Sequence, residues 1–298
     1  MDKHDDSHRV QRSASKRALL LTLVLAGGYM VAEIVGGLIT NSLALLADAG
    51  HMFSDVAALG LSLFAIWIAE RPPTPQRTYG YYRTEILAAL VNGAALIAVS
   101  VYIFIEAYRR LLQPPEVMGA VMMWIAMGGL VINLLGLWIL RAGRDESLNV
   151  RGAWLHVLTD ALGSVGAIIA GALIWAFGWN WVDAAISAFI GLLVIYSAWR
   201  LVMESVHVLM ESAPRGIDVD EVRQTIAATP GVIGVHDLHV WTITSGLDSL
   251  SAHVVAGEAE SHADLLRRLR HALHERFGID HITIQIEPDG FDERPTPV

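Results

Sequence analysis

Two His-x-x-x-Asp motifs lie inside long apolar runs of the chain. The first pairs His51 with Asp55, and the second pairs His156 with Asp160. Residues four apart lie on one face of an α-helix, so each pair can direct an imidazole nitrogen and a carboxylate to one place. Two such helices facing each other would supply two nitrogen and two oxygen ligands, which suits tetrahedral Zn²⁺ at about 2.0–2.2 Å. The spacing therefore predicts a metal site between two helices.

The apolar setting of these motifs favours a functional role. Of the twelve histidines, only His51 and His156 fall in the hydrophobic part of the chain. An aspartate at the centre of a membrane helix costs about 2.5–3.5 kcal/mol, so such residues are rare without a function. The alternative is a pair of His–Asp hydrogen bonds that only lock a helix bundle. Asp48, three residues before His51, either lines the exit path, orients the histidine through a hydrogen bond without binding the metal itself, or has a structural role.

Composition indicates a membrane protein with one soluble part. The 298 residues are 54% apolar and 17% charged, and none is cysteine, so any metal must be held by His, Asp or Glu. The net charge of −9 is uneven, with −1 in residues 1–205 and −8 in residues 206–298. An acidic surface disfavours nucleic-acid binding, which requires basic groups for phosphate contacts.

Six apolar segments predict six transmembrane helices, each about the 20 residues that a bilayer core requires. They lie at residues 18–39, 44–69, 84–107, 117–140, 152–177 and 182–203. We expect a cytoplasmic N-terminal arm (1–17), a transmembrane domain (18–205) and a cytoplasmic domain (206–298). For the two His–Asp pairs to meet, the fifth helix must begin before residue 152 or lie displaced toward the cytoplasm.

Lys and Arg concentrate on one side of these segments, which predicts that both termini are cytoplasmic in a multi-pass protein of the cytoplasmic (inner) membrane. Three further polar residues, Glu33, Asn92 and Asn133, would face the bundle interior. Hydrogen bonding between helices is the favoured role for them.

The acidic tail has the pattern of a small α+β domain. A helix that Asp218 can cap runs to about Thr229 and precedes strands near 232–243 and 248–256. A helix at 261–277 precedes a strand at 281–287. The order αββαβ predicts a two-layer, ferredoxin-like domain.

Several possible metal ligands cluster in this tail. They are His236, Asp237, His239, His253, His262, His281 and Glu287. Alternation along the strands places His253, His281 and Glu287 on the face opposite the aliphatic residues, where a metal could reach them. A single histidine on a strand is more often solvated or hydrogen-bonded, so the membership of a site stays open.

The motifs together resemble the cation diffusion facilitator family, in particular its bacterial Zit/Czc-type zinc exporters. The segments that carry the resemblance are Ser42–Asp55 (SLALLADAGHMFSD), Arg83–Glu85 (RTE), Asn149–Asp160 (NVRGAWLHVLTD) and Val235–Trp241 (VHDLHVW). The resemblance implies a homodimer with six membrane helices per subunit, a cytoplasmic ferredoxin-like domain and metal/proton antiport. It also implies that His51, Asp55, His156 and Asp160 form the transport site. His236, His253 and Glu287 match cytoplasmic metal positions, which His262 and His281 match less closely.

We therefore expect export of a divalent cation, with Zn²⁺ as the first choice, in exchange for protons, and we expect Zn²⁺ to act also as a regulatory ligand of the tail. Cd²⁺, Co²⁺, Ni²⁺ and Mn²⁺ remain alternatives. Catalytic zinc usually keeps three protein ligands and an open position for water, so four ligands without an added base argue against an intramembrane enzyme. A non-transporting receptor would explain the tail but not the intramembrane pairs.

Overall fold

The computed structural model describes residues 24, 26–69, 74–140, 148–257 and 261–291. The chain divides into two compact units, one of residues 1–67 and 88–202 and the other of residues 68–87 and 203–298. His4 and His8, in the predicted N-terminal arm, lie outside the described residues.

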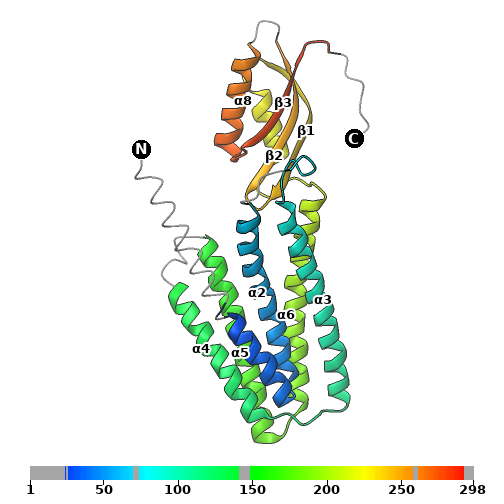
Figure 1. Cartoon of the computed structure of the whole chain (residues 1–298), viewed down its shortest axis with the longest axis vertical. Helices are drawn as coiled ribbons and strands as arrows, with labels where there is room; N and C mark the ends of the chain where they lie inside the picture. Colours follow the sequence, from blue (N-terminus) through cyan, green and yellow to red (C-terminus); the bar gives the residue numbers. More distant parts are fainter. Residues whose placement is uncertain (1–23, 25, 70–73, 141–147, 258–260, 292–298) are drawn as a thin grey trace. The chain divides into compact units, whose positions relative to one another are not determined.

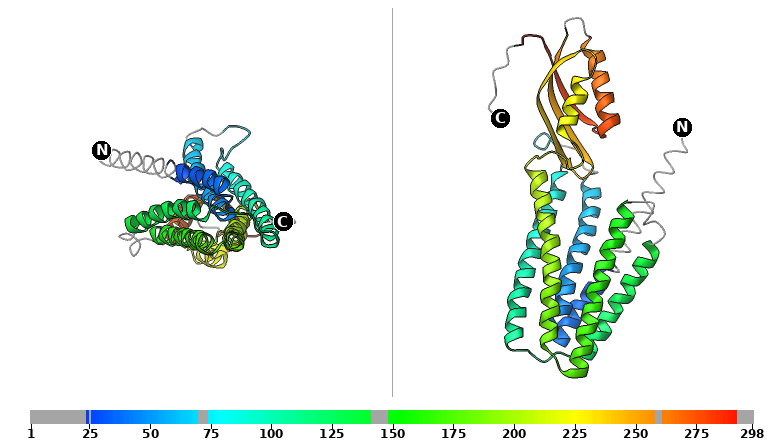
Figure 2. Two further views of the ribbon diagram at one scale, coloured as in Figure 1. Left: turned by 90° about the horizontal axis from the view of Figure 1, so that it is seen from below. Right: turned by 180° about the vertical axis from the view of Figure 1, so that it is seen from behind.

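Long helices run alongside one another through the first unit (Figure 1) and are seen end on in Figure 2. A first helix, Ala26–Thr40, precedes five more. These are α2 (Leu43–Ala69), α3 (Arg83–Leu112), α4 (Gly119–Leu140), α5 (Leu148–Phe177) and α6 (Trp181–Leu209). The helix α5 begins at Leu148, before residue 152. An early start was one of the two alternatives that would let the two His–Asp pairs meet.

Four of these helices, in the part of the chain that is described, are long and apolar enough to cross a membrane. They are Arg83–Leu112, Gly119–Trp138, Asp160–Phe177 and Trp181–Leu209, and Ala26–Thr40 is a shorter apolar helix. Their outward faces carry large exposed side chains such as Tyr102, Trp124 and Trp175. Apolar residues all round a helix are typical of segments that face lipid.

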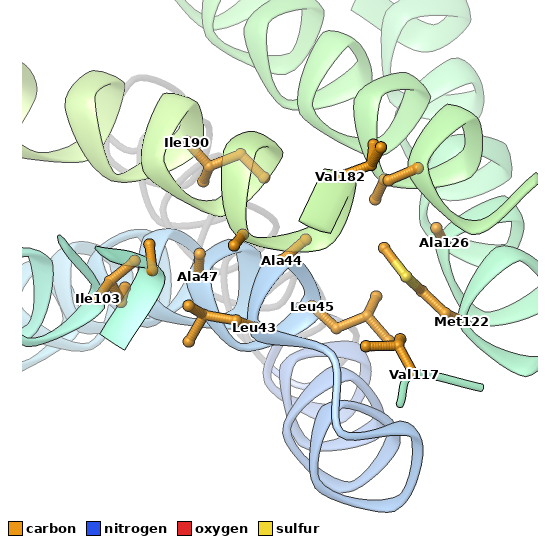
Figure 3. Close-up of a cluster of buried hydrophobic side chains, with 14 of the residues drawn as sticks. Leu43, Ala44, Leu45, Ala47, Ile103, Val117, Met122, Ala126, Val182 and Ile190 are labelled. Atoms are coloured by element: carbon orange, nitrogen blue, oxygen red, sulfur yellow. The ribbon is translucent and has the colours of Figure 1, made fainter. Parts of the chain in front are cut away.

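Small and aliphatic residues fill the centre of this unit (Figure 3), because helices approach closely only where side chains are short. The cluster includes Leu43, Ala44, Leu45, Ala47, Ile103, Val117, Met122, Ala126, Val182 and Ile190. The tightest contact with backbone atoms joins α4 to α5, where a Cβ atom on Gly119 would lie 2.6 Å from the carbonyl oxygen of Gly171. Only glycine allows this approach.

A buried carboxylate ties α6 to the start of α2. The Ser42 hydroxyl donates to Asp183 Oδ1 over 2.6 Å, and the Leu43 and Ala44 amides donate to the same carboxylate over 2.7 and 3.2 Å. The first amides of a helix have no partner within the helix. Asp183 therefore satisfies them from a neighbouring helix and fixes where α2 begins.

The second unit contains the predicted αββαβ order. Its elements are α7 (Val219–Ala227), β1 (Val232–Thr244), β2 (Leu247–Ala256), α8 (His262–Phe277) and β3 (His281–Pro288). The sheet order is β1-β2-β3, with β1 antiparallel and β3 parallel to β2. Both helices cover one face of the sheet (Figure 1), and their buried residues, including Ile226, Leu265 and Leu269, pack on it. Asp218 caps α7 by accepting from two amides, as its position before the helix predicts.

Candidate metal centres

One imidazole and one carboxylate meet between α2 and α5. His51 Nε2 lies 3.0 Å from Asp160 Oδ1, and both side chains are 17% exposed. Two ligands of a tetrahedral zinc ion at ordinary bond lengths are about 3.3 Å apart. The two atoms are therefore already spaced nearly as they would be around a bound ion.

The contact joins the two motifs to each other, since His51 belongs to the first pair and Asp160 to the second. Asp55 and His156 lie on the same two helices, four residues from His51 and Asp160 respectively. Their side chains fall outside what the structure describes. Helical spacing places each of them one turn from the observed contact. The site of four residues therefore stays a prediction. The structure shows one contact of it, between His51 of the first motif and Asp160 of the second.

Polar residues around this contact differ in their partners. Asn92 Nδ2 donates to Ser54 Oγ over 3.4 Å, and Asn133 Nδ2 donates to Ser164 Oγ over 3.3 Å, which agrees with hydrogen bonding between helices. Glu33 differs: it is fully buried, and neither of its oxygens makes a hydrogen bond with a described residue.

Asp48 lies one turn from His51 on α2. It is 6% exposed, and it interacts with the Glu33 carboxyl group. Asp48 also lies against Gly163 of α5, since a Cβ atom added to that glycine would be 3.5 Å from Asp48 Oδ1. Asp48 therefore lies among buried groups beside the His51–Asp160 contact.

A second group of metal ligands forms in the sheet of the other unit. His236 Nε2 lies 3.0 Å from Glu287 Oε2, and His253 Nδ1 lies 3.1 Å from Glu287 Oε1. One ligand atom from each of the three residues falls within 4.8 Å of the others. The strand register explains the grouping, because His236 is the direct partner of His253 on β1 and β2. Two nitrogens and a carboxylate oxygen are donors that suit Zn²⁺.

The surroundings make this group strongly polar. Glu287 is buried, with its side chain 3% exposed, and its Oε1 also accepts from Gln285 Nε2 over 2.7 Å. A hydrogen bond from His239, together with the nearby His253 and His236, holds the pKa of Asp237 below its usual range. Asp237 Oδ2 lies 3.6 Å from His253 Nε2. Both nitrogens of His253 therefore face a carboxylate.

The structure does not bring His262 and His281 into this group among the described residues. His262 is exposed at the first position of α8, and His281 is exposed at the start of β3, with its ring edge-on to Tyr79. Strand alternation predicted one face of the sheet for His253 and Glu287, and their contact agrees with it. It could not show that His281, six residues before Glu287 on β3, is too far along the strand to join them.

Sequence reasoning missed Asp183, whose role is clear only in the structure. Its carboxylate also lies 3.7 Å from Arg110 Nη1, which donates to the Asn41 carbonyl oxygen, while Arg110 Nε donates to Glu106 Oε1. The available signal was an acidic residue in the first turn of an apolar helix, three residues after the short loop that ends the preceding span. An acidic residue in the first turn is already explained by the dipole of its own helix. The sequence therefore gives no sign that this carboxylate accepts hydrogen bonds from the amides of α2.

Two family models match the chain in succession. The cation efflux transmembrane domain matches residues 19–210, and the cytoplasmic domain of cation efflux proteins matches residues 214–289. Together they cover both units that carry the candidate metal centres.

Three curated proteins are similar over nearly the whole chain. The "Cadmium, cobalt and zinc/H(+)-K(+) antiporter" of Bacillus subtilis is 47% identical, over 95% of this chain and 92% of its own length. The "Metal cation efflux system protein CzcD" of Cupriavidus metallidurans is 48% identical, over 92% and 87% respectively. The "Zinc transporter ZitB" of Escherichia coli is 43% identical, over 95% and 91%.

Proposed function

The chain belongs to the cation efflux family, and from this premise we propose that it exports divalent metal, with Zn²⁺ as the main substrate, in exchange for protons. The family consists of transporters, not enzymes. The contact between His51 and Asp160 carries the proposal, because it joins two spans through two groups that bind zinc. The site would be completed by Asp55 and His156.

The donor set favours Zn²⁺ over Mg²⁺ and Ca²⁺. Two imidazoles and two carboxylates suit zinc, whereas the harder ions prefer shells of oxygen. Cd²⁺ and Co²⁺, which the name of the Bacillus subtilis relative includes, are further candidates that the same ligands could hold. Ligand type alone does not separate these ions, since affinity for such sites rises gradually along the transition series.

Competition between protons and metal would couple the two fluxes. Metal binding requires neutral imidazole and ionised carboxylate. Imidazole takes up a proton at about pH 6.5 in water, so a site open to a more acidic exterior would gain protons and release metal. Facing the cytoplasm at neutral pH, it would lose protons and bind metal. The bundle must alternate between these two states for net export.

The group of His236, His253 and Glu287 supports a regulatory zinc site in the second unit. The two imidazoles face the Glu287 carboxylate, so binding an ion would replace these contacts by coordination. An ion there would also offset part of the −8 charge of residues 206–298. Lower repulsion would favour the approach of two such domains in a homodimer, consistent with the family model that covers this region.

The same proposal places the protein in the cytoplasmic membrane with both termini in the cytoplasm. The support is the excess of Lys and Arg in the termini and in the loops on their side of the membrane. The second unit would then sample cytoplasmic zinc, and the transport site would carry it outward.

Metal uptake into proteoliposomes under a pH gradient, acidic inside, tests the transport function. We expect uptake by the wild type and none by Asp160→Ala. Asp280→Ala is a matched control, because Asp280 makes a 2.8 Å contact with His274 on the exposed surface of the second unit. Intact zinc binding without flux in the wild type would instead identify a non-transporting receptor, and equal flux in Asp160→Ala would exclude the proposed site.

A further inference from the structure

A cavity of about 530 Å³ opens against the sheet of the second unit. Its walls come from β1 and β2, from the start of α3 with the segment before it, and from the turn after α6. They include Tyr79, Arg83, Glu211, His239, Trp241 and Ser251, all of which belong to this one unit. Sites for small molecules are commonly cavities of about 300–1,000 Å³. The volume therefore suits a small ligand.

The sheet contributes one continuous face to this cavity. His239 on β1 is the direct partner of Ser251 on β2, and Trp241 follows His239 by two residues, so the three lie on one face. Val240 and Leu250 are buried on the opposite face, in the core that α7 and α8 complete. The cavity therefore lies on the face of the sheet that the two helices leave uncovered.

Two hydrogen bonds fix the start of α3 against this sheet. The Thr244 hydroxyl donates to Glu85 Oε2 over 2.6 Å, and the Ser245 hydroxyl donates to Glu85 Oε1 over 3.1 Å. Thr244 ends β1, and Glu85 follows Arg83 by two residues. The Arg83 wall and the sheet wall are therefore held together before any ligand binds, which lowers the entropic cost of binding.

Two opposite charges lie side by side in the cavity wall. Arg83 Nη2 donates to Glu211 Oε1 over 2.6 Å, and the two side chains are 40% and 59% exposed. A guanidinium group has five N–H donors, so Arg83 has others for a second acceptor. Exposed ion pairs contribute little free energy. A ligand that offers each charge its own partner can therefore replace this pair at little cost.

The uncharged part of the wall adds donors and aromatic rings. Within the described part of the chain, the Tyr79 and Ser251 hydroxyls and the Trp241 indole N–H make no hydrogen bond. Such donors can serve the oxygens of a phosphate, for which a guanidinium is also a favoured partner. An ammonium group is attracted to the faces of Tyr and Trp rings. A ligand with both groups fits better than a simple anion, which Glu211 would repel.

The cavity lies at the ends of two apolar helices. The helix α3 begins at Arg83 and is long and apolar enough to cross a membrane, and α6, a second such helix, ends at Leu209, two residues before Glu211. Lipid headgroups lie at the level where membrane spans end, and Trp and Tyr are enriched there. A phosphate joined to an ammonium group is therefore available from the membrane itself.

We propose that this cavity binds the headgroup of a zwitterionic phospholipid of the phosphatidylethanolamine type. The phosphate lies on Arg83 and the neighbouring hydroxyl and indole donors, and the ammonium group lies on Glu211. One lipid thereby joins the start of α3 to the turn after α6. Neither the identity of the exported metal nor its exchange for protons enters this inference, so lipid binding can be tested without measuring transport.

Titration of the purified full-length protein in detergent with short-chain phosphatidylethanolamine, followed by native mass spectrometry, measures the binding. We expect Arg83→Gln and Glu211→Gln each to weaken it about tenfold, because each removes one charged partner. The matched controls are Arg109→Gln, in the last turn of α3 with a side chain 72% exposed, and Glu116→Gln on the exposed connection before α4. Both should keep the wild-type affinity.

Two further ligands test the headgroup and its source. Phosphatidylglycerol has the phosphate but no ammonium group, so it should bind the wild type more weakly and should not respond to Glu211→Gln. Glycerophosphoethanolamine is the same headgroup without acyl chains, and it should compete only weakly. Equal affinity for phosphatidylglycerol would overturn the zwitterionic assignment, and tight binding of glycerophosphoethanolamine would overturn the lipid assignment in favour of a soluble ligand.

A conservative variant keeps the test decisive if Arg83→Gln does not fold. Arg83→Lys retains a cation beside Glu211 but lacks the planar fork that binds phosphate through two donors. We expect it to bind phosphatidylethanolamine several-fold more weakly than the wild type. Equal binding by the wild type, Arg83→Lys and Glu211→Gln would refute the proposed site.

Discussion

The contact between Gly119 and Gly171 gives a prediction whose size follows from the structure. A Cβ atom on Gly119 would lie 2.6 Å from the Gly171 carbonyl oxygen and 2.8 Å from the Trp175 amide nitrogen. A Cβ atom on Gly171 would lie 2.8 Å from the Gly119 carbonyl oxygen. These neighbours are backbone atoms, so the side chains cannot simply rotate away. Gly119→Ala must move α4 and α5 apart.

The required movement sets the expected cost. Carbon atoms in ordinary contact are about 3.5 Å or more from a neighbouring heavy atom, so the helices must separate by almost 1 Å. Overpacking of this kind costs about 1–3 kcal/mol. Alanine recovers up to about 1 kcal/mol of helix propensity, but Gly119 is the first residue of α4 and gains less. We expect Gly119→Ala to lower the free energy of unfolding by about 1–2 kcal/mol.

A double-mutant cycle separates this explanation from a local effect at each glycine. One separation of the helices relieves both clashes, so Gly119→Ala with Gly171→Ala should cost at least about 0.5 kcal/mol less than the sum of the single changes. The control is Gly128→Ala on the same helix, where the nearest atom, in Tyr29, is 3.7 Å from the new Cβ. We expect it to be neutral or stabilising.

Denaturant unfolding of the purified protein in detergent, followed by tryptophan fluorescence, measures these differences. The reasoning is refuted if Gly119→Ala unfolds like Gly128→Ala. It is also refuted if the two single costs add fully, because the helices would then respond to each change independently.

Three further predictions concern other parts of the chain. Asp183→Ala leaves two α2 amides and a hydroxyl without their acceptor and should lower the free energy of unfolding by about 3 kcal/mol; wild-type stability would contradict the capping role. Glu287→Gln should weaken zinc binding to the second unit by roughly 10- to 100-fold, as measured by calorimetry, whereas exposed His262→Gln should not; equal effects would exclude the proposed group. Hydrogen bonding with Ser261, and then Arg267, lowers the pKa of Asp264, so its stabilising effect is complete above about pH 3.9 and is lost as pH falls through the lower folded-state value. Asp264→Asn should therefore weaken the acid dependence of unfolding, and an unaltered dependence would contradict it.

Periodicity was sufficient to predict most of the fold. The apolar segments placed α2 and α4 to within two residues, and the tail pattern predicted the three described strands in order. The requirement that the two His–Asp pairs meet left α5 either an early start or a displaced position, and α5 begins early, at Leu148. These features depend on local spacing and on the length of a bilayer, both of which can be read from the sequence.

Partners between distant segments could not be predicted in the same way. The carboxylate of Asp183 caps a helix that begins 140 residues earlier in the chain, and nothing in the local sequence identifies that partner. Glu33 was interpreted as a hydrogen-bonding residue between helices, but local spacing could not identify Asp48 of α2 as a group that interacts with it. His281 has the right residue type and strand face for a ligand, but its position along β3 excludes it from the group around Glu287. Such outcomes depend on packing and register between elements.

The spacing of His51 and Asp160 bears on how a transporter can bind an ion and still release it. Their hydrogen bond joins two polar groups inside an apolar bundle. An ion bound at the proposed site would replace that bond and change the distance from 3.0 Å to about 3.3 Å. Because the ligands would barely move, little binding energy would be lost to rearrangement, but the lost hydrogen bond and the competing protons would limit the net affinity. The close contact of α4 with α5 at Gly119 would then make these two helices move together, so that alternating access would shift α5 and its ligands as part of a pair.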